Sequence, residues 1–298
     1  LLSLTSVLSI IFGLKKIAES GFHWLPVLSI LFGLAIGALF LRRQRQLSDP
    51  MIDLKLFRSA RFSAALTIYT LITFIAFGGF IFIFQYLQLI QKLSPMESGW
   101  LALPSFGGFI VGSVFAPMFT TRFRPVQIVT AGLALATVGF GLITQVRVET
   151  GLGFLVTGML IYSLGLAPVI TLTTDLIVGA APPERAGVAS AISETSSEFG
   201  GALGIAVLGS IGTAIYRTRM EREMPDAIPL ALAENATDTL GGAVMVAERI
   251  SSGLGTQLLS TANDAFVSGM QLNAFIGALI AAGLAVLAAS RLKEPIAG

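Results

Sequence analysis

The chain has 298 residues, of which 54% are hydrophobic and only 12% are charged. Soluble domains carry about twice that share of charge because their surfaces face water, so the composition excludes a soluble domain and indicates an all-α polytopic membrane protein. The formal net charge of +2 excludes a nucleic-acid-binding surface. The sequence contains no cysteine, which excludes disulfides and thiolate metal sites.

About eight apolar segments approach the length of roughly 20 residues that a membrane-spanning helix needs. The chain starts inside an apolar run at Leu1 without the features of a signal peptide, which favours a truncated first span and a preceding part that also lies in the membrane. In chain order, the expected spans are residues 1–14, 25–41, 62–90, 100–121, 126–146, 152–176, 187–214 and 266–290.

Basic residues are concentrated in alternate connections between these spans. They lie in segments 42–61, 122–124, 185 and 291–293, whereas the short connections of the other set hold only Lys15, Lys16, Lys92 and Arg147. Cytoplasmic loops carry the excess of Lys and Arg, so we expect a multi-pass protein of the inner (plasma) membrane with a cytoplasmic tail at 291–298.

Two of the connections are long. The cytoplasmic one, residues 42–61, contains Ser48-Asp49-Pro50 before an apolar stretch, which predicts an N-capped amphipathic helix. The outer one, residues 216–264, holds apolar stretches at 240–250 and 254–259, which favour short packed helices over disorder.

Glu194 and Glu198 are the main ionisable residues inside the expected spans. Their i, i+4 spacing puts both carboxylates on one helix face, and desolvation and mutual repulsion favour a bound proton. We therefore interpret them as candidates for proton coupling or cation recognition. The alternative is that they are solvated near the cytoplasmic end of the helix. Asp175, near an inner helix end, is the weaker candidate.

Aromatic residues are frequent in segment 62–90. Phe74 and Phe77 share a face with two threonines, an arrangement that suits flat lipophilic cations through attraction to the ring faces. Rings that simply face lipid are the alternative. The expected substrate pocket comprises Tyr69, Phe74, Phe77 and Tyr162.

Sequence motifs of nucleotide hydrolysis, serine hydrolysis and zinc proteolysis are missing from the sequence. We therefore expect a protein that is not an enzyme, that needs neither a metal nor another cofactor, and that draws its energy from a proton gradient.

Three stretches resemble the fourteen-helix drug:proton antiporter branch of the major facilitator superfamily, the QacA type. The first is residues 49–58 (DPMIDLKLFR), with Phe62 following. The second combines Tyr86-Leu87-Gln88 with Ser94-Pro95 and residues 99–104 (GWLALP). The third runs from Pro183-Glu184-Arg185 through Glu194 and Glu198 to Gly209-Ser210.

The resemblance implies that the eight spans are helices 7 to 14 of fourteen. Residues 1–41 would be two linker helices and residues 62–290 the C-terminal six-helix bundle. An N-terminal bundle of the same protein would be the missing partner. Glu194 and Glu198 match acidic positions that the family uses for coupling or cation recognition. Some relatives carry an acid in helix 10, but residues 101–121 contain none.

The expected function is proton-coupled efflux of lipophilic and cationic compounds, such as quaternary ammonium compounds and dyes, by alternating access. One alternative is an exporter of a neutral lipid or natural product, with carboxylates that serve structure or gating. The other is a non-transporting membrane scaffold or one half of a channel.

Overall fold

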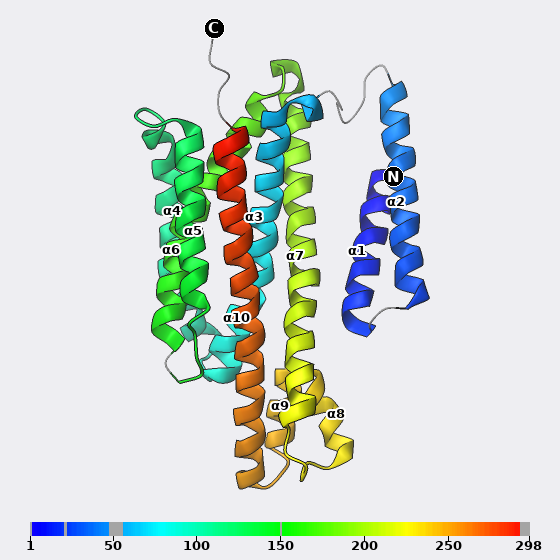
Figure 1. The fold of residues 1–298 in the computed structure, drawn as a ribbon, viewed down its shortest axis with the longest axis vertical. Coiled ribbons are helices and arrows are strands. Elements are labelled where there is room, and N and C mark those ends of the chain that lie inside the picture. The colour runs from blue at the N-terminus through cyan, green and yellow to red at the C-terminus, as the bar shows by residue number, and fades with distance from the viewer. Residues whose placement is uncertain (1, 21–22, 48–55, 150, 293–298) are drawn as a thin grey trace.

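All regular structure in the described residues is helical. The computed structural model describes residues 2–20, 23–47, 56–149 and 151–292 (Figure 1). The α-helices are α1 (Leu2–Ser20), α2 (Trp24–Gln46), α3 (Ala60–Gln85), α4 (Pro95–Phe119), α5 (Pro125–Ile143), α6 (Gly151–Gly179), α7 (Ala186–Glu223), α8 (Leu230–Asp238), α9 (Leu240–Ala247) and α10 (Ser252–Arg291). Short helical turns are η1 (Leu56–Arg58), η2 (Tyr86–Ile90) and η3 (Pro183–Arg185).

Each of the eight expected spans coincides with a long helix, and seven of these helices in the described chain are long and apolar enough to cross a membrane. The eighth, α1, is also helical, but its last turns contain Lys15, Lys16 and Glu19. It is not among the seven helices found by length and composition in the described chain. The all-α, polytopic prediction is confirmed.

Some sequence expectations fall on residues outside the described part of the chain. The Ser48-Asp49-Pro50 segment and most of the amphipathic helix expected after it lie in 48–55, and most of the tail lies in 293–298. Of the connection, η1 is described, and its Leu56 is buried.

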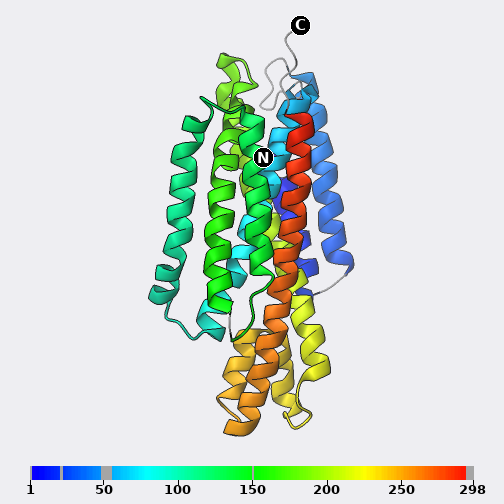
Figure 2. The ribbon, with the colours of Figure 1, turned by 60° about the vertical axis from the view of Figure 1, so that its left-hand side comes forward.

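Helices α3 to α7 and α10 form one bundle, and the α1–α2 pair lies beside α7 (Figures 1 and 2). In the bundle, α3 packs on α7, while α6 packs on both α4 and α5, and α10 packs on α5 and α7. Local sequence starts the helices: Ser94 and Glu97 form reciprocal hydrogen bonds at the beginning of α4. Such a capping box satisfies backbone N–H groups that the first turn leaves free.

The α3–α7 contact depends on glycine. A Cβ atom at Gly204 would overlap the carbonyl oxygen of Phe74, and one at Gly200 would overlap that of Thr70. Only a residue without a side chain permits this backbone approach, which is the use that small residues have between membrane helices.

Helices α7 and α10 continue well past the bilayer-length portions that the sequence predicted. They have 38 and 40 residues, which corresponds to almost 60 Å at about 1.5 Å per residue, against a hydrocarbon core of about 30 Å. Their extensions pack with α8 and α9 at one end of the bundle (Figures 1 and 2). We refer to this as the α8–α9 end, and to the opposite end, where α10 finishes, as the tail end.

The expected outer connection at 216–264 therefore consists of the end of α7, the two short helices α8 and α9, and the beginning of α10. The two short helices pack on the ends of α7 and α10; α9 falls in the expected stretch 240–250, whereas α8 precedes it. The prediction of a further short helix at 254–259 is wrong, because these residues form the first turns of α10. Gly255 does not interrupt that helix; it lets α10 approach the carbonyl oxygen of Ala247 at the end of α9.

Candidate functional site

A cavity of about 420 Å³ lies between α3, α4 and α6. Its size falls in the range of about 300 to 1,000 Å³ that is usual for small-molecule sites. We name it the Tyr162 cavity. Its lining is apolar and aromatic, with a few hydroxyl groups: Thr73, Ala76, Phe77, Phe80, Ala102, Ser105, Phe106, Phe109, Met159, Tyr162, Ser163, Leu166 and Ile170.

Tyr162 is fixed on α6 by its neighbours. Its side chain is 9% exposed, and its ring stacks on Phe140 of α5, with centroids 5.0 Å apart. On the α4 side, the hydroxyl groups of Ser105 and Ser163 share a hydrogen bond. Buried hydroxyl groups that hydrogen-bond to each other need no further partner. The cavity therefore presents aromatic surface, and these two hydroxyl groups do not require a hydrogen bond from a ligand.

Phe77 connects the cavity to α7. Its side chain is 51% exposed and lines the Tyr162 cavity. On its other side it covers Gly201 of α7, where an added Cβ atom would lie 3.3 Å from the ring. Gly201 is three residues from Glu198, so Phe77 contacts α7 within one helical turn of that carboxylate's position.

Glu194 and Glu198 lie two to three turns inside α7, and both side chains are exposed. Neither lines the Tyr162 cavity. Their spacing does put both on one face of a single continuous helix. Asp175 lies on α6, one turn before the helix ends at Gly179, and is also exposed.

The four aromatic residues expected in a pocket separate into two groups. Phe77 and Tyr162 line the same cavity, whereas Tyr69 and Phe74 do not. Tyr69 is buried, and the backbone of Phe74 lies against Gly204 of α7. The three aromatic residues of α3 were grouped because they are aromatic, but of these three only Phe77 lines the cavity between α3, α4 and α6.

The contribution of α4 was missed. Phe106 and Phe109 line the cavity three residues apart, next to Ser105. Their i, i+3 spacing was a usable signal. The helix that packs against Phe106 and Phe109 could be identified only from the tertiary structure.

Among the described residues, no three His, Asp or Glu side chains are grouped so that they could hold a metal ion. The expectation that no cofactor takes part stays a prediction.

Helices of membrane length, packed around a cavity of this size, define a polytopic membrane protein with room for a small organic molecule. The profile of the Major Facilitator Superfamily matches residues 1–205. The chain belongs to this superfamily of membrane transporters, which confirms the predicted superfamily.

Two relatives are similar over nearly the whole chain. Multidrug efflux pump LfrA of Mycolicibacterium smegmatis is 33% identical over 280 residues, which cover 94% of this chain and 55% of the relative. The tetracenomycin C resistance and export protein of Streptomyces glaucescens is 32% identical over 297 residues, covering 96% and 54%. The chain thus spans about half the length of these relatives.

A solved structure supports the fold. It is a bacterial homologue of the human lysosomal transporter Spinster, in an inward-facing and occupied conformation, with a TM-score of 0.61 at 17% identity. The match covers 96% of this chain and 67% of that one. At this identity the likeness concerns the fold alone.

Proposed function

We propose that the protein exports lipophilic, often cationic compounds, such as quaternary ammonium compounds and dyes, in exchange for protons. Drug efflux is supported by relatives that are named for multidrug efflux and for resistance and export. Exchange for protons is supported by the position of Glu194 and Glu198 on α7. The exporter would work by alternating access, with this chain supplying helices 7 to 14 and an N-terminal bundle facing it.

The observation that carries the proposal is the place of Phe77 between the Tyr162 cavity and α7. A flat cation in the cavity would lie on aromatic faces, with an attraction of about 0.5 to 2 kcal/mol per ring. Any shift of Phe77 on binding acts on Gly201, less than one helical turn from Glu198. Through this contact, a ligand in the Tyr162 cavity can affect the part of α7 that carries Glu194 and Glu198.

Protonation of Glu194 or Glu198 would supply the coupling. A neutral carboxyl group attracts a cation less than a carboxylate does, so proton uptake favours release and cation binding favours proton loss. Inward movement of each proton releases about 2.3 kcal/mol per 100 mV of membrane potential. Nucleotide hydrolysis is not needed for this cycle.

The proposed orientation puts the tail end in the cytoplasm of the inner (plasma) membrane. Arg124, Arg185 and Arg291 all lie in or next to connections at the tail end. The exposed Trp24 is the first residue of α2, and the exposed Trp100 lies in the second turn of α4, both toward the opposite end. Both features follow the usual distribution of basic and indole side chains in membrane proteins.

The test uses the full-length protein in everted membrane vesicles, with ethidium as the fluorescent cation. Changing both Glu194→Gln and Glu198→Gln should abolish the ethidium transport that an imposed pH gradient drives. The matched control is Glu221→Gln, which removes an exposed carboxylate near the far end of the same helix. Unchanged pH-driven transport in the double variant would refute the coupling role.

Export of an uncharged lipid or natural product is the second candidate. The lining of the Tyr162 cavity contains no charged side chain, which favours a neutral substrate equally well. Resistance of cells to cationic and to uncharged compounds, measured side by side, separates the two. Resistance confined to uncharged compounds would favour the second.

A further inference from the structure

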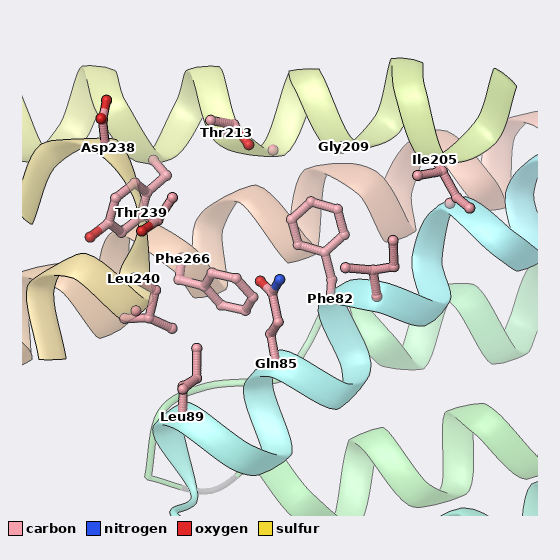
Figure 3. A pocket seen from close by; sticks show the side chains of 15 residues that line it. Phe82, Gln85, Leu89, Ile205, Gly209, Thr213, Asp238, Thr239, Leu240 and Phe266 are labelled. Carbon is pink, nitrogen blue, oxygen red and sulfur yellow. The ribbon is translucent and has the colours of Figure 1, made fainter. Parts of the chain in front are cut away.

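A second pocket, of about 490 Å³, lies at the α8–α9 end (Figure 3). We name it the Asp238 pocket. It is bounded by α3, α7, the junction of α8 and α9, and α10. The lining residues that matter here are Phe82, Gln85, Thr213, Asp238, Thr239 and Phe266, which Figure 3 labels.

This pocket is distinct from the Tyr162 cavity. The two share no lining residue, because they use different sides of α3: Thr73, Ala76, Phe77 and Phe80 face one, and Gly78, Ile81, Phe82 and Gln85 face the other. A ligand can therefore occupy one without displacing a ligand from the other.

The wall of the Asp238 pocket combines aromatic surface with a few polar groups. The rings of Phe82 and Phe266 are 5.7 Å apart and come from α3 and α10. The exposed amide of Gln85 lies beside them, and the carboxylate of Asp238 lies at the α8–α9 junction (Figure 3). Apolar surface together with one carboxylate suits an organic cation with a large apolar body.

Asp238 forms an accessible ion pair. Its carboxylate lies 2.9 Å from the guanidinium of Arg217, and the two side chains are 55% and 39% exposed. Exposed ion pairs of this kind stabilise by about 0 to 1 kcal/mol, so a second cation can compete for the carboxylate at little cost.

Arg217 is not part of the lining of the Asp238 pocket. A neighbouring hollow of about 590 Å³, between α7 and α1, is lined by Arg217, Asp238 and Thr239. Asp238 borders both hollows, whereas Arg217 lines only the one beside α1. A cation in the Asp238 pocket thus has access to the carboxylate while Arg217 retains space in which to turn away.

We propose that the Asp238 pocket is a second binding site for lipophilic organic cations, in which Arg217 competes with the ligand for Asp238. The ligand class rests on the proposed function, but binding is measured directly and needs no transport. The aromatic body of the ligand lies on Phe82 and Phe266, and its charge is directed to Asp238.

The experiment measures local protection by tetraphenylphosphonium in the purified full-length protein. A Thr239→Cys variant places a thiol on the pocket wall, and its rate of labelling by a water-soluble maleimide is followed. Tetraphenylphosphonium should slow this labelling, and the uncharged triphenylphosphine oxide should slow it less. A Glu234→Cys variant, on the exposed side of α8 outside the pocket lining, is the matched control and should not be protected.

Two further changes in the Thr239→Cys background give shifts of opposite sign. Asp238→Asn should raise the half-protecting concentration of the cation about threefold to fivefold, the scale of an exposed ion pair. Arg217→Gln should lower it, because the competing guanidinium is gone. A purely structural role for this pair would instead make both variants shift in the same direction, which overturns the proposal.

Absence of protection in the parent variant also overturns it. A protein that exports ethidium yet shows no protection at Thr239→Cys refutes this inference alone. Protection without pH-driven export leaves the site standing and refutes the proposed function.

Discussion

The rings of Phe140 and Tyr162 lie nearly parallel across the α5–α6 contact, with 7° between their planes. Phe140 is 4% exposed and does not line the Tyr162 cavity, so it acts on the cavity through the orientation of Tyr162. A residue on α5 therefore shapes a surface that α3, α4 and α6 enclose.

This relationship predicts that Phe140→Leu weakens substrate binding from outside the cavity. Aromatic pairs contribute about 0.5 to 1.5 kcal/mol beyond their buried area, so the KM for ethidium export should rise about fivefold. Tyr162→Phe keeps the stacked ring and should change KM less than Phe140→Leu does. Phe119→Leu, at an exposed ring on α4, is the control. Equal KM values in Phe140→Leu and the parent protein would contradict the prediction.

Gly204→Ala should destabilise the α3–α7 contact. The added Cβ atom overlaps the carbonyl oxygen of Phe74, and backbone cannot turn away as a side chain can. Overpacking of this kind costs about 1 to 3 kcal/mol, which should lower the melting temperature of the protein in detergent. Gly187→Ala is the control on the same helix, because a Cβ atom there meets nothing within 4 Å. Equal melting temperatures for Gly204→Ala and Gly187→Ala would contradict this prediction, because α3 and α7 could then move apart without loss of stability.

Tyr86→Phe should loosen the connection between α3 and α4. The hydroxyl of Tyr86 donates to the carbonyl oxygen of Arg147 and accepts from the side chain of Gln91, both at 2.8 Å. Its removal takes this partner from the carbonyl oxygen of Arg147, at a cost of about 1 to 3 kcal/mol, while Gln91 keeps its bond to the carbonyl oxygen of Val148. Hydrogen exchange at the residues around Gln91 and Arg147 measures the loosening. Tyr69→Phe, on the preceding helix α3, is the control, and equal exchange in both variants would contradict a role for the Tyr86 hydrogen bonds in holding this connection.

The sequence alone determined the class of the protein and the position of its helices. Long runs without charge have one stable form in a bilayer, since a helix satisfies every backbone group internally. That reasoning located all eight helices, and motifs such as the Pro183-Glu184-Arg185 stretch were enough to indicate the superfamily. Glu194 and Glu198 were noticeable for the same reason, because carboxylates are rare within such helices.

The tertiary structure decided which faces meet. Phe77 and Tyr162 are 85 positions apart in the printed sequence and line one cavity, while the nearby Tyr69 and Phe74 do not. The stretch 254–259 was expected to form a short helix and is instead the beginning of α10, where Gly255 makes a close contact. Asp238, which the sequence did not single out, lies between two hollows. Hydrophobic periodicity shows that a helix has a buried face, but it does not show which helix covers that face. The partner is selected by packing among several helices, which depends on the whole bundle at once.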